Sequence, residues 1–383
     1  MSLQASTQSV VPGNIIDLGL GHPDPSLLPL EVIQKASIHR TAQKDPLILQ
    51  YGLEQGDESF RKLLADYLSF NCSCPVKENH LFITNGVSQA LDLLCTIFTV
   101  PGDTVFVEDP TYFLSLRIFE DHGLKVIPIA TDSKGLIVED LEDKLKSVKP
   151  AFLYTIPTHQ NPSGATLPRE RRMEIAELGG KHNFLILADE VYHFLTYRGE
   201  PPPGFSNFID RGPVISLGSF SKILAPGLRL GWIHASPSLL KPLITCGFLD
   251  SGGGLAPFLS SIVRSVFELD LLQKHIDYLC RVYRERLEAL VNSLRREFGK
   301  LVDFTVPCGG FFLWVRFTDN TDVTSLLPEL EKYSVRFMPG IRCSEQGSFR
   351  NYMRISFSFY NSNNLEEGVR RLHKAYVSSN HSH

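Results

Sequence analysis

Short apolar segments rich in β-branched and aromatic residues recur along the first 220 residues, separated by segments of helical period. Each apolar segment has the length of a strand and is bounded by polar or turn-forming residues, which is typical of strands buried on both faces. This alternation predicts an α/β fold with a largely parallel sheet, whose ligand site lies at the carboxyl ends of the strands. The predicted strands are 80–84, 104–109, 151–157, 183–190 and 213–219.

A different pattern begins at Leu271. Apolar residues recur at helical spacing as far as Phe298, with charged residues between them and Gly299 as a stop. We expect one long helix here that links two domains. The segments 309–317 and 351–359 then have the pattern of strands in a smaller α+β domain. A chain of 383 residues also exceeds the usual size of a single hydrophobic core.

The composition, 43% hydrophobic and 21% charged, is that of an ordinary globular protein and excludes a disordered or fibrous chain. A net charge of −4 without any cluster of Lys and Arg argues against nucleic acid as a partner. No apolar run reaches the roughly 18 residues of a membrane helix, and segment 1–10 lacks the apolar stretch of a signal peptide. We expect a cytoplasmic protein that binds neither nucleic acid nor membrane.

The seven cysteines are scattered through the chain, mostly in apolar surroundings, as is typical of reduced thiols. Cys72 and Cys74 form the only local pair, and no second pair or histidine doublet completes a metal site around them. We therefore expect no metal.

Candidate chemistry stands at the ends of the predicted strands. After the first strand, NGVSQA leads into a helix, so Val87, Ser88 and Gln89 would present backbone N–H groups and a hydroxyl at a helix N-terminus. Such a terminus favours a phosphate, although a simple serine cap explains the motif when it is taken alone. After the second strand, Tyr112 follows a proline turn, where its ring is suited either to stacking on a flat ligand or to packing.

The next two strand ends carry an amide and a carboxylate. Asn161 lies in THQNPSG, which by itself reads as a plain Asn-Pro turn. Asp189 ends a near-continuous apolar strand, where an unpaired carboxylate would cost several kcal/mol, so it requires a cationic partner or a hydrogen-bonded network. Tyr192 follows within reach of the same place, whereas Glu190 points to the other side of the strand. A structural ion pair is the alternative for Asp189.

Lys222 in GSFSKILAPGLRLGW directly follows the strand 213–219, in apolar surroundings that do not suit a surface lysine. A lysine in a partly dry pocket loses its proton more easily and becomes a nucleophilic amine. Ser219 and Ser221 flank it as hydroxyl donors, and Arg229 adds a positive group suited to phosphate.

Together these side chains describe one ligand with five features. Pyridoxal 5'-phosphate has all five. The features are a phosphate for Ser88, Ser219, Ser221 and Arg229, a ring for Tyr112, a ring cation for Asp189, a phenolate oxygen for Asn161 and Tyr192, and an aldehyde for Lys222.

The motifs NGVSQAL, QNPSG, ADEVY and GSFSKILAPGLRLGW, in this order, resemble those of the fold type I PLP-dependent aminotransferases of class I/II. The resemblance extends over most of the chain, from LGLGHPDPSLLP to MRISFSF. Within that superfamily, GHPDPSLLP, QYGLEQGDESFR and SKILAPGLRLGW are more similar to the 2-aminoadipate and kynurenine aminotransferases than to the aspartate branch.

The resemblance implies a division of the chain. A large PLP-binding domain, 31–270, would contain a mostly parallel, seven-stranded sheet flanked by helices, and 271–383 would form the linking helix and a smaller α+β domain. The segment 1–30 would pack on the small domain and the substrate site. A homodimer is also implied, in which Tyr51 reaches the phosphate bound by the neighbouring subunit.

The resemblance also implies roles for single residues. Arg354 in MRISFS would bind the substrate α-carboxylate, a role that suits a bidentate guanidinium, with Asn161 and Gly21 beside it. The catalytic residues would be Lys222, which holds the cofactor and then moves the substrate α-proton, Asp189, which keeps the ring nitrogen protonated, and Tyr112. The full set of expected cofactor contacts is Tyr51, Val87, Ser88, Gln89, Tyr112, Asn161, Asp189, Tyr192, Ser219, Ser221, Lys222 and Arg229.

The expected function is amino transfer between an L-amino acid, 2-aminoadipate, aromatic or broad in range, and a 2-oxo acid such as 2-oxoglutarate. A β-lyase acting on cysteine conjugates would use the same cofactor-binding residues and is the main alternative. A PLP-binding regulatory module is a weaker one, because GHPDP begins near residue 21 and leaves no room for a DNA-binding domain. A nicotinamide-dependent dehydrogenase lacks its G-x-G-x-x-G turn and leaves Lys222 unexplained.

Two further segments of the sequence are open to more than one interpretation. His159 precedes the QNP turn and Ser163 replaces the common Thr; we interpret His159 as a structural turn residue, although its side chain titrates near neutral pH. The glycine-rich stretch 249–258 is either a flexible wall of the site or a linker.

Overall fold

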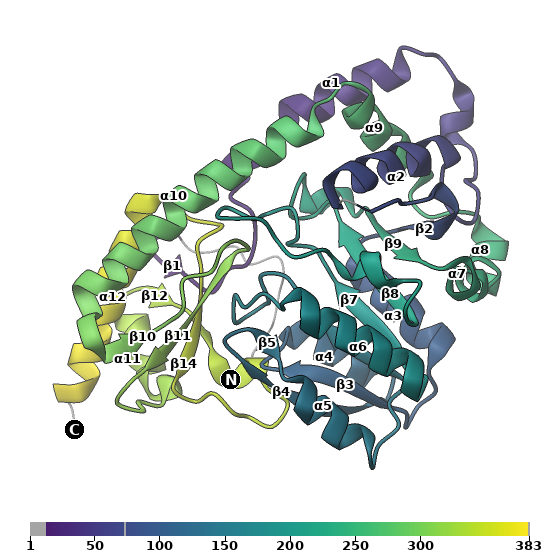
Figure 1. The fold of residues 1–383 in the computed structure, drawn as a ribbon. Coiled ribbons are helices and arrows are strands. Elements are labelled where there is room, and N and C mark those ends of the chain that lie inside the picture. The colour runs from purple at the N-terminus through teal and green to yellow at the C-terminus, as the bar shows by residue number, and fades with distance from the viewer. Residues whose placement is uncertain (1–12, 73, 382–383) are drawn as a thin grey trace.

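The computed structural model describes residues 13–72 and 74–381, which form a large α/β part and a smaller α+β part joined by one long helix (Figure 1). The large part is built on an eight-stranded sheet with the order β2-β9-β8-β7-β6-β3-β4-β5. Its strands are β2 (Leu81–Thr84), β3 (Thr104–Asp109), β4 (Lys125–Asp132), β5 (Gly135–Leu136), β6 (Phe152–Thr155), β7 (Leu185–Asp189), β8 (Val214–Ser219) and β9 (Gly231–Ala235).

The five predicted strands are confirmed as β2, β3, β6, β7 and β8, with ends that differ by a few residues. The five adjacent strands from β8 to β4 run parallel, whereas β9 and β5 are antiparallel to their neighbours. The expected seven strands are exceeded by the two-residue β5, which folds back on the end of β4. The carboxyl ends of β3, β6, β7 and β8 therefore lie along one edge, as the sequence analysis predicted.

Helices cover both faces of this sheet. Val105, Phe152 and Leu187 belong to the core that includes residues of α3 (Val87–Phe98) and α4 (Phe113–Asp121). Their sequence neighbours Phe106, Leu153 and Ile186 belong to a second core with α5 (Val138–Leu145) and α6 (Arg169–His182). Because successive strand side chains point to opposite faces, burial of both sets makes these strands continuously apolar.

The remaining helices of the large part lie around one end of the sheet (Figure 1). The glycine-rich stretch 249–258 is a linker in part, since it ends one helix, pairs Gly254 with Gly52, and begins the next helix. These helices are α1 (Leu30–Thr41), α2 (Glu58–Cys72), α7 (Pro237–Ile244), α8 (Gly247–Gly252) and α9 (Pro257–Glu268).

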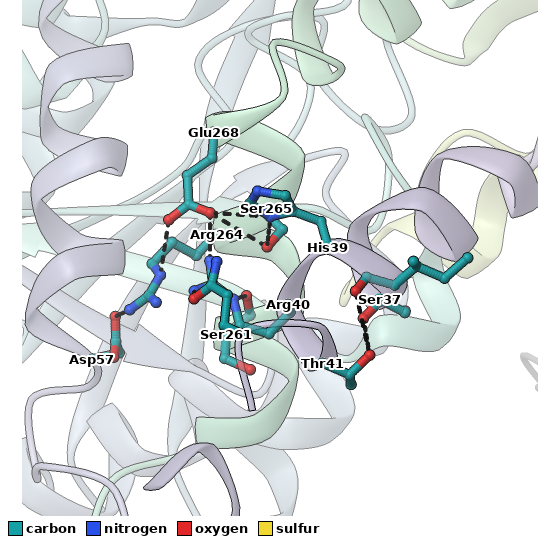
Figure 2. Close-up of polar contacts among 11 residues, drawn as sticks. Ser37, His39, Arg40, Thr41, Asp57, Ser261, Arg264, Ser265 and Glu268 are labelled. Carbon is teal, nitrogen blue, oxygen red and sulfur yellow. Dashed lines mark hydrogen bonds and ion pairs between the residues drawn. The ribbon is translucent and has the colours of Figure 1, made fainter. Parts of the chain in front are cut away.

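A polar network fastens α1 to α9 (Figure 2). The buried side chain of Arg40 donates hydrogen bonds to Glu268 Oε2 at 2.6 Å and to the carbonyl of Ser261 at 2.9 Å. Arg264 pairs with Glu268 at 3.2 Å and with Asp57 at 3.4 Å. A buried arginine must be paired, so this network holds α1 against α9. It thereby sets the direction in which the chain leaves α1.

The predicted long helix is confirmed as α10 (Leu272–Phe298), which runs from the large part to the small part (Figure 1). The small part contains an antiparallel sheet in the order β10-β11-β14-β13, next to a parallel pair between β1 and β12. Its elements are β1 (Ile16–Asp17), β10 (Val302–Asp303), β11 (Phe312–Phe317), α11 (Leu327–Lys332), β12 (Val335–Arg336), β13 (Met338–Pro339), β14 (Tyr352–Ser356) and α12 (Ser362–His381).

The N-terminal segment crosses to the small part. Leu18 donates its backbone N–H to Arg336 at 2.8 Å, and Asp24 pairs with Arg286 of α10 at 2.6 Å. Residues 1–12 of the segment 1–30 lie outside the described residues. Short 3₁₀ helices complete the chain at Pro25–Leu27, Pro46–Leu49, Glu78–His80, Phe205–Phe208, Pro226–Leu228, Gly299–Leu301, Val323–Leu326 and Gly340–Cys343.

In the part of the chain that the structure covers, no helix is long and apolar enough to span a bilayer. Within the same residues no group of three or more His, Cys, Asp or Glu could hold a metal ion.

Candidate active site

Lys222 lies in the turn after β8, beside the N-terminal segment. Its Nζ donates a hydrogen bond to the carbonyl of Gly21 at 3.1 Å and lies 5.3 Å from the ring centroid of Phe311. Burial, followed by the positive charge of Arg354, lowers the pKa of Lys222 to about 8. About one tenth of the amine is therefore neutral at pH 7, far more than for a lysine of ordinary pKa, and the neutral form is the one that a nucleophile or general base needs.

Asp189 ends β7 and is 4% exposed. Its Oδ2 accepts a hydrogen bond from the hydroxyl of Tyr154 at 2.9 Å, and its Oδ1 accepts a longer one, 3.4 Å, from the backbone N–H of Val191. Burial raises the pKa of Asp189 to about 6, with Tyr154 as the largest opposing influence. The hydrogen-bonded network expected of this carboxylate is present, and a cation beside it would be strongly favoured.

Three strand ends meet where a phosphate could bind. The sheet register sets Gly231 of β9 beside Thr84 of β2 on one side and Ser219 of β8 on the other. A Cβ atom at Gly231 would come within 3.0 Å of the Cα of Gly86, so only glycine permits this approach. Gly86, at φ +86°, then opens α3.

The predicted anion-binding residues lie around this junction. Ser219 Oγ donates to Ser221 Oγ at 3.0 Å, and Arg229, held at φ +46°, donates from Nη2 to the carbonyl of Asn85 at 3.3 Å. The guanidinium lies against Gly86, where an added Cβ would approach Nη2 to 2.9 Å. No described carboxylate pairs with Arg229, so its charge remains available for an anion at the start of α3.

The side chains in the first turn of α3 contribute less to the proposed anion site than Arg229 does. Gln89 uses its Oε1 to accept the backbone N–H of Asn85 at 3.2 Å, which stiffens the turn before the helix. Ser88 is exposed and Val87 is half-buried at the first turn. These residues offer backbone N–H groups in the unpaired first turn of the helix.

Arg354 joins the small part to the large one. From β14 its Nη1 donates to Asn161 Oδ1 at 2.9 Å, and its Nη2 donates to the carbonyl of Gly19 at 2.7 Å. Its Cζ lies 4.1 Å from the ring centroid of Phe312. No carboxylate of the described residues forms an ion pair with this buried guanidinium, which is a costly arrangement unless a bound acid supplies one.

Aromatic rings form the walls. Tyr192 is buried against Phe311 and Phe312, with ring centroids 5.4 Å and 6.0 Å away. Burial raises the pKa of Tyr192, and it raises that of Tyr112 to about 12, so both phenols stay protonated. Gly21 lies against Phe312, which leaves no space for a Cβ: one would stand 2.7 Å from the ring.

His159 is buried beside the site. It adopts φ +50°, its Nε2 lies 2.8 Å from Thr196 Oγ1, and Gly309 and Gly310 pack directly on its ring. Burial lowers its pKa to about 3, so the ring is neutral at physiological pH. These contacts are those of a structural turn residue, as the sequence analysis interpreted it.

Sequence reasoning missed several neighbours of these residues. Tyr154 lies within the predicted strand 151–157 and was not among the candidate site residues. Its hydroxyl, in an otherwise apolar run, is the signal that could have identified it. Glu108, fully buried, accepts bonds from Thr155 and from the backbone of Ile156, and the pKa of His22 is lowered by burial and by the charge on Lys222. Only the tertiary structure brings these groups to the site.

The residues present fit pyridoxal phosphate. An amine of lowered pKa, a buried carboxylate with one weakly bonded oxygen, and an unpaired guanidinium at a helix N-terminus match its aldehyde, ring nitrogen and phosphate. Tyr51, by contrast, lies on an exposed segment away from these groups in the same subunit.

Fold and site thus fit an enzyme that uses pyridoxal phosphate, and comparison with known proteins gives the family. Residues 14–372 match the family model described as aminotransferase class I and II, and the chain belongs to this family. It is an enzyme, a transaminase, and its cofactor is pyridoxal phosphate. The fold class, family and cofactor inferred from the motifs are therefore confirmed.

Individual relatives lie in the branch that the motifs indicated. The chain is 33% identical over 365 residues to aromatic-amino-acid aminotransferase 1 of Thermococcus litoralis, covering 94% of this chain and 87% of the relative. It is 31% identical to the 2-aminoadipate transaminase of Thermus thermophilus, covering 94% and 90%. A solved structure of Pyrococcus horikoshii kynurenine aminotransferase in complex with PMP superposes with a TM-score of 0.89 at 32% identity, covering 95% and 91%.

Proposed function

We propose that this transaminase takes the amino group from an L-amino acid of the aromatic or 2-aminoadipate type and passes it to a 2-oxo acid such as 2-oxoglutarate. One observation carries the proposal. Lys222 and Arg354 donate hydrogen bonds to two nearby carbonyls of the N-terminal segment, those of Gly21 and Gly19. An acid held by Arg354 thereby has its α-carbon near the Lys222 amine. The names of the relatives in the same branch support this substrate range.

When bound, pyridoxal phosphate supplies an aldehyde that takes the amino group and a ring that accepts the electron pair of the α-carbon. In our proposal Lys222 would hold the cofactor through its amine. With a pKa of about 8, its Nζ would also serve as the base that moves the α-proton of the substrate.

Asp189 and Arg354 would each stabilise a different charged group, Asp189 on the cofactor and Arg354 on the substrate. The carboxylate of Asp189 would hold a proton on the ring nitrogen and so would stabilise negative charge as it develops. Arg354 binds and orients the α-carboxylate through its planar fork, with Asn161 and Gly21 beside it. Tyr112 would lie on the ring, and Asn161 and Tyr192 would face its phenolic oxygen.

The phosphate would be held by the start of α3, with Val87, Ser88 and Gln89, and by Ser219, Ser221 and Arg229. This set offers amide and hydroxyl donors with one cation and no carboxylate, which is the composition that favours a phosphate dianion.

We further propose a homodimer. The segment after α1 exposes a row of apolar side chains, including Leu49 at 76% and Tyr51 at 81%, and the Gly52–Gly254 pairing attaches it to the linker between α8 and α9. The Arg40–Glu268 network of Figure 2 holds this segment in place. An apolar row of this kind marks an interface, and a second copy covering it would bring Tyr51 to the neighbouring phosphate.

The test is the absorbance spectrum of the purified holoenzyme, followed during addition of single amino acids without any 2-oxo acid. Aromatic amino acids or 2-aminoadipate should convert the bound cofactor to its amine form, and 2-oxoglutarate should then reverse the change. Release of pyruvate and ammonia from cysteine conjugates, without such conversion by any amino acid, would show that the enzyme is a β-lyase instead.

A further inference from the structure

Tyr154 is a fully buried residue in the middle of the large part, and it is not one of the residues proposed to contact cofactor or substrate. Register explains why it meets Asp189. Tyr154 of β6 pairs with Leu187 of β7, and Asp189 lies two residues further along β7, so both side chains point to the same face.

The Tyr154 hydroxyl has a single proton, which it donates to Asp189 Oδ2 at 2.9 Å. The neighbouring hydroxyl of Ser115 donates its own proton elsewhere, to the carbonyl of Tyr112 at 2.6 Å. The proton of Tyr154 is therefore committed to the carboxylate proposed to face the ring nitrogen.

The surroundings leave Asp189 dependent on this one donor. Its other described hydrogen bond is the 3.4 Å contact from Val191, and the charged groups that act on it are Lys222, which favours the carboxylate, and Glu190, which disfavours it. The phenols of Tyr112 and Tyr192 face it without being charged. A buried carboxylate with so few donors is readily protonated, and a protonated acid can no longer hold a proton on the ring nitrogen.

We propose that Tyr154 is a positioning residue that keeps Asp189 ionised and turned so that Oδ1, which accepts only the long bond from Val191, can also accept the ring N–H of the cofactor. This inference rests on the proposed function, because it concerns the strength of the contact between Asp189 and the ring. It assigns Tyr154 no contact with substrate or cofactor.

The substitution Tyr154→Phe tests this inference with little damage to packing, since the ring that contacts Phe119 edge-on at 5.6 Å is kept. Tyr197→Phe is the matched control: Tyr197 is also a buried tyrosine whose hydroxyl donates to one acceptor, the carbonyl of Gly310, but it is not bonded to Asp189.

The readout is the nitrogen NMR shift of ¹⁵N-labelled pyridoxal phosphate in the holoenzymes, recorded against pH, with the cofactor dissociation constant measured in parallel. In Tyr154→Phe we expect the ring nitrogen to lose its proton at a lower pH than in wild type. The cofactor should also dissociate more readily, by up to about tenfold, because an Asp189 that is less fully ionised holds the ring N–H more weakly. Tyr197→Phe should match wild type in both measurements.

An unchanged nitrogen titration in Tyr154→Phe would overturn the inference, and so would an equal change in Tyr197→Phe, which would make the effect one of general packing. Failure of the proposed function looks different, because the wild-type holoenzyme would then keep its protonated ring nitrogen but would not be converted to its amine form by aromatic amino acids or 2-aminoadipate.

Discussion

The side-chain oxygen of Asn161 accepts a hydrogen bond from Nη1 of Arg354 at 2.9 Å, which joins the loop after β6 to a strand of the small domain. The two residues are 193 positions apart in the chain. The proposed carboxylate-binding group is therefore fixed to the strand ends that would hold the cofactor. Movement of the small domain would alter the distance between substrate and cofactor.

Substitution of Arg354 by lysine should impair substrate binding more than cofactor binding. A lysine keeps the charge but cannot present two parallel N–H donors to a carboxylate, so we expect kcat/KM to fall about 100-fold, mainly through KM. Steady-state kinetics with the best amino acid from the panel measure this. Arg350→Lys, at an exposed ion pair with Asp322, is the control, and a KM equal to wild type in Arg354→Lys would contradict the assignment.

Attachment of pyridoxal phosphate to the cofactor-free protein should depend on pH through Lys222. The neutral amine is the reactive form, and burial lowers its pKa to about 8 from an ordinary value of 10.5. The attachment rate should therefore rise with pH and level off above about pH 8. Stopped-flow absorbance measures this rate. Lys222→Ala should show no attachment and no turnover, and a midpoint near the ordinary value would disprove a desolvated lysine.

Replacement of Asp189 by alanine should separate cofactor attachment from catalysis. Lys222 is untouched, so the cofactor should still bind covalently. Without a carboxylate beside the ring nitrogen, developing charge is poorly stabilised and the half-reaction with an amino acid should slow by about 100-fold or more. Rapid-mixing spectra of the half-reaction decide the matter, and wild-type rates would remove Asp189 from the mechanism.

Glu108 should make the stability of the protein depend on pH. Burial raises its pKa from 4.5 to about 7, against the hydrogen bonds that it accepts from Ile156 and Thr155. Because the folded-state pKa lies above the unfolded one, the folded state holds the extra proton in this interval. The free energy of unfolding should therefore fall as pH rises from about 4.5 to about 7.

In Glu108→Gln this contribution to the pH dependence should vanish. Urea unfolding of both proteins at about pH 5 and about pH 7.5 provides the comparison. Glu288→Gln, at an exposed pair with Arg198, should behave like wild type. A wild-type pH dependence in Glu108→Gln would show that other groups cause it.

The exposed apolar segment after α1 should determine the oligomeric state. Leu49→Asp places a charge in the proposed interface, so it should give a monomer that also binds the cofactor more weakly, because Tyr51 of the second subunit is withdrawn. Light scattering coupled to size exclusion gives the molar mass. Phe70→Asp, at a residue 86% exposed on α2, serves as the control, and a monomeric wild type would refute the dimer.

The architecture and most of the candidate site could be predicted from the amino-acid sequence, for a local reason. Strands buried on both faces must be continuously apolar, so 183–190 and 213–219 could be located without coordinates, and the polar residues that follow them had to lie at one edge of the sheet. Asp189 and Lys222 were identified in this way, because a carboxylate or amine in apolar surroundings requires an explanation. The shorter β5 and the half-buried β4 have no such pattern and were not predicted.

The groups that act on those residues come from distant segments and could not be predicted from local patterns. Lys222 meets the carbonyl of Gly21 across 201 positions, and Arg354 meets that of Gly19 across 335. Tyr154 reaches Asp189 only because β6 and β7 pair in one particular register, which no local periodicity specifies. Residue types indicate what chemistry a side chain can perform, whereas desolvation and neighbouring charges set its pKa, and both arise from contacts between distant segments.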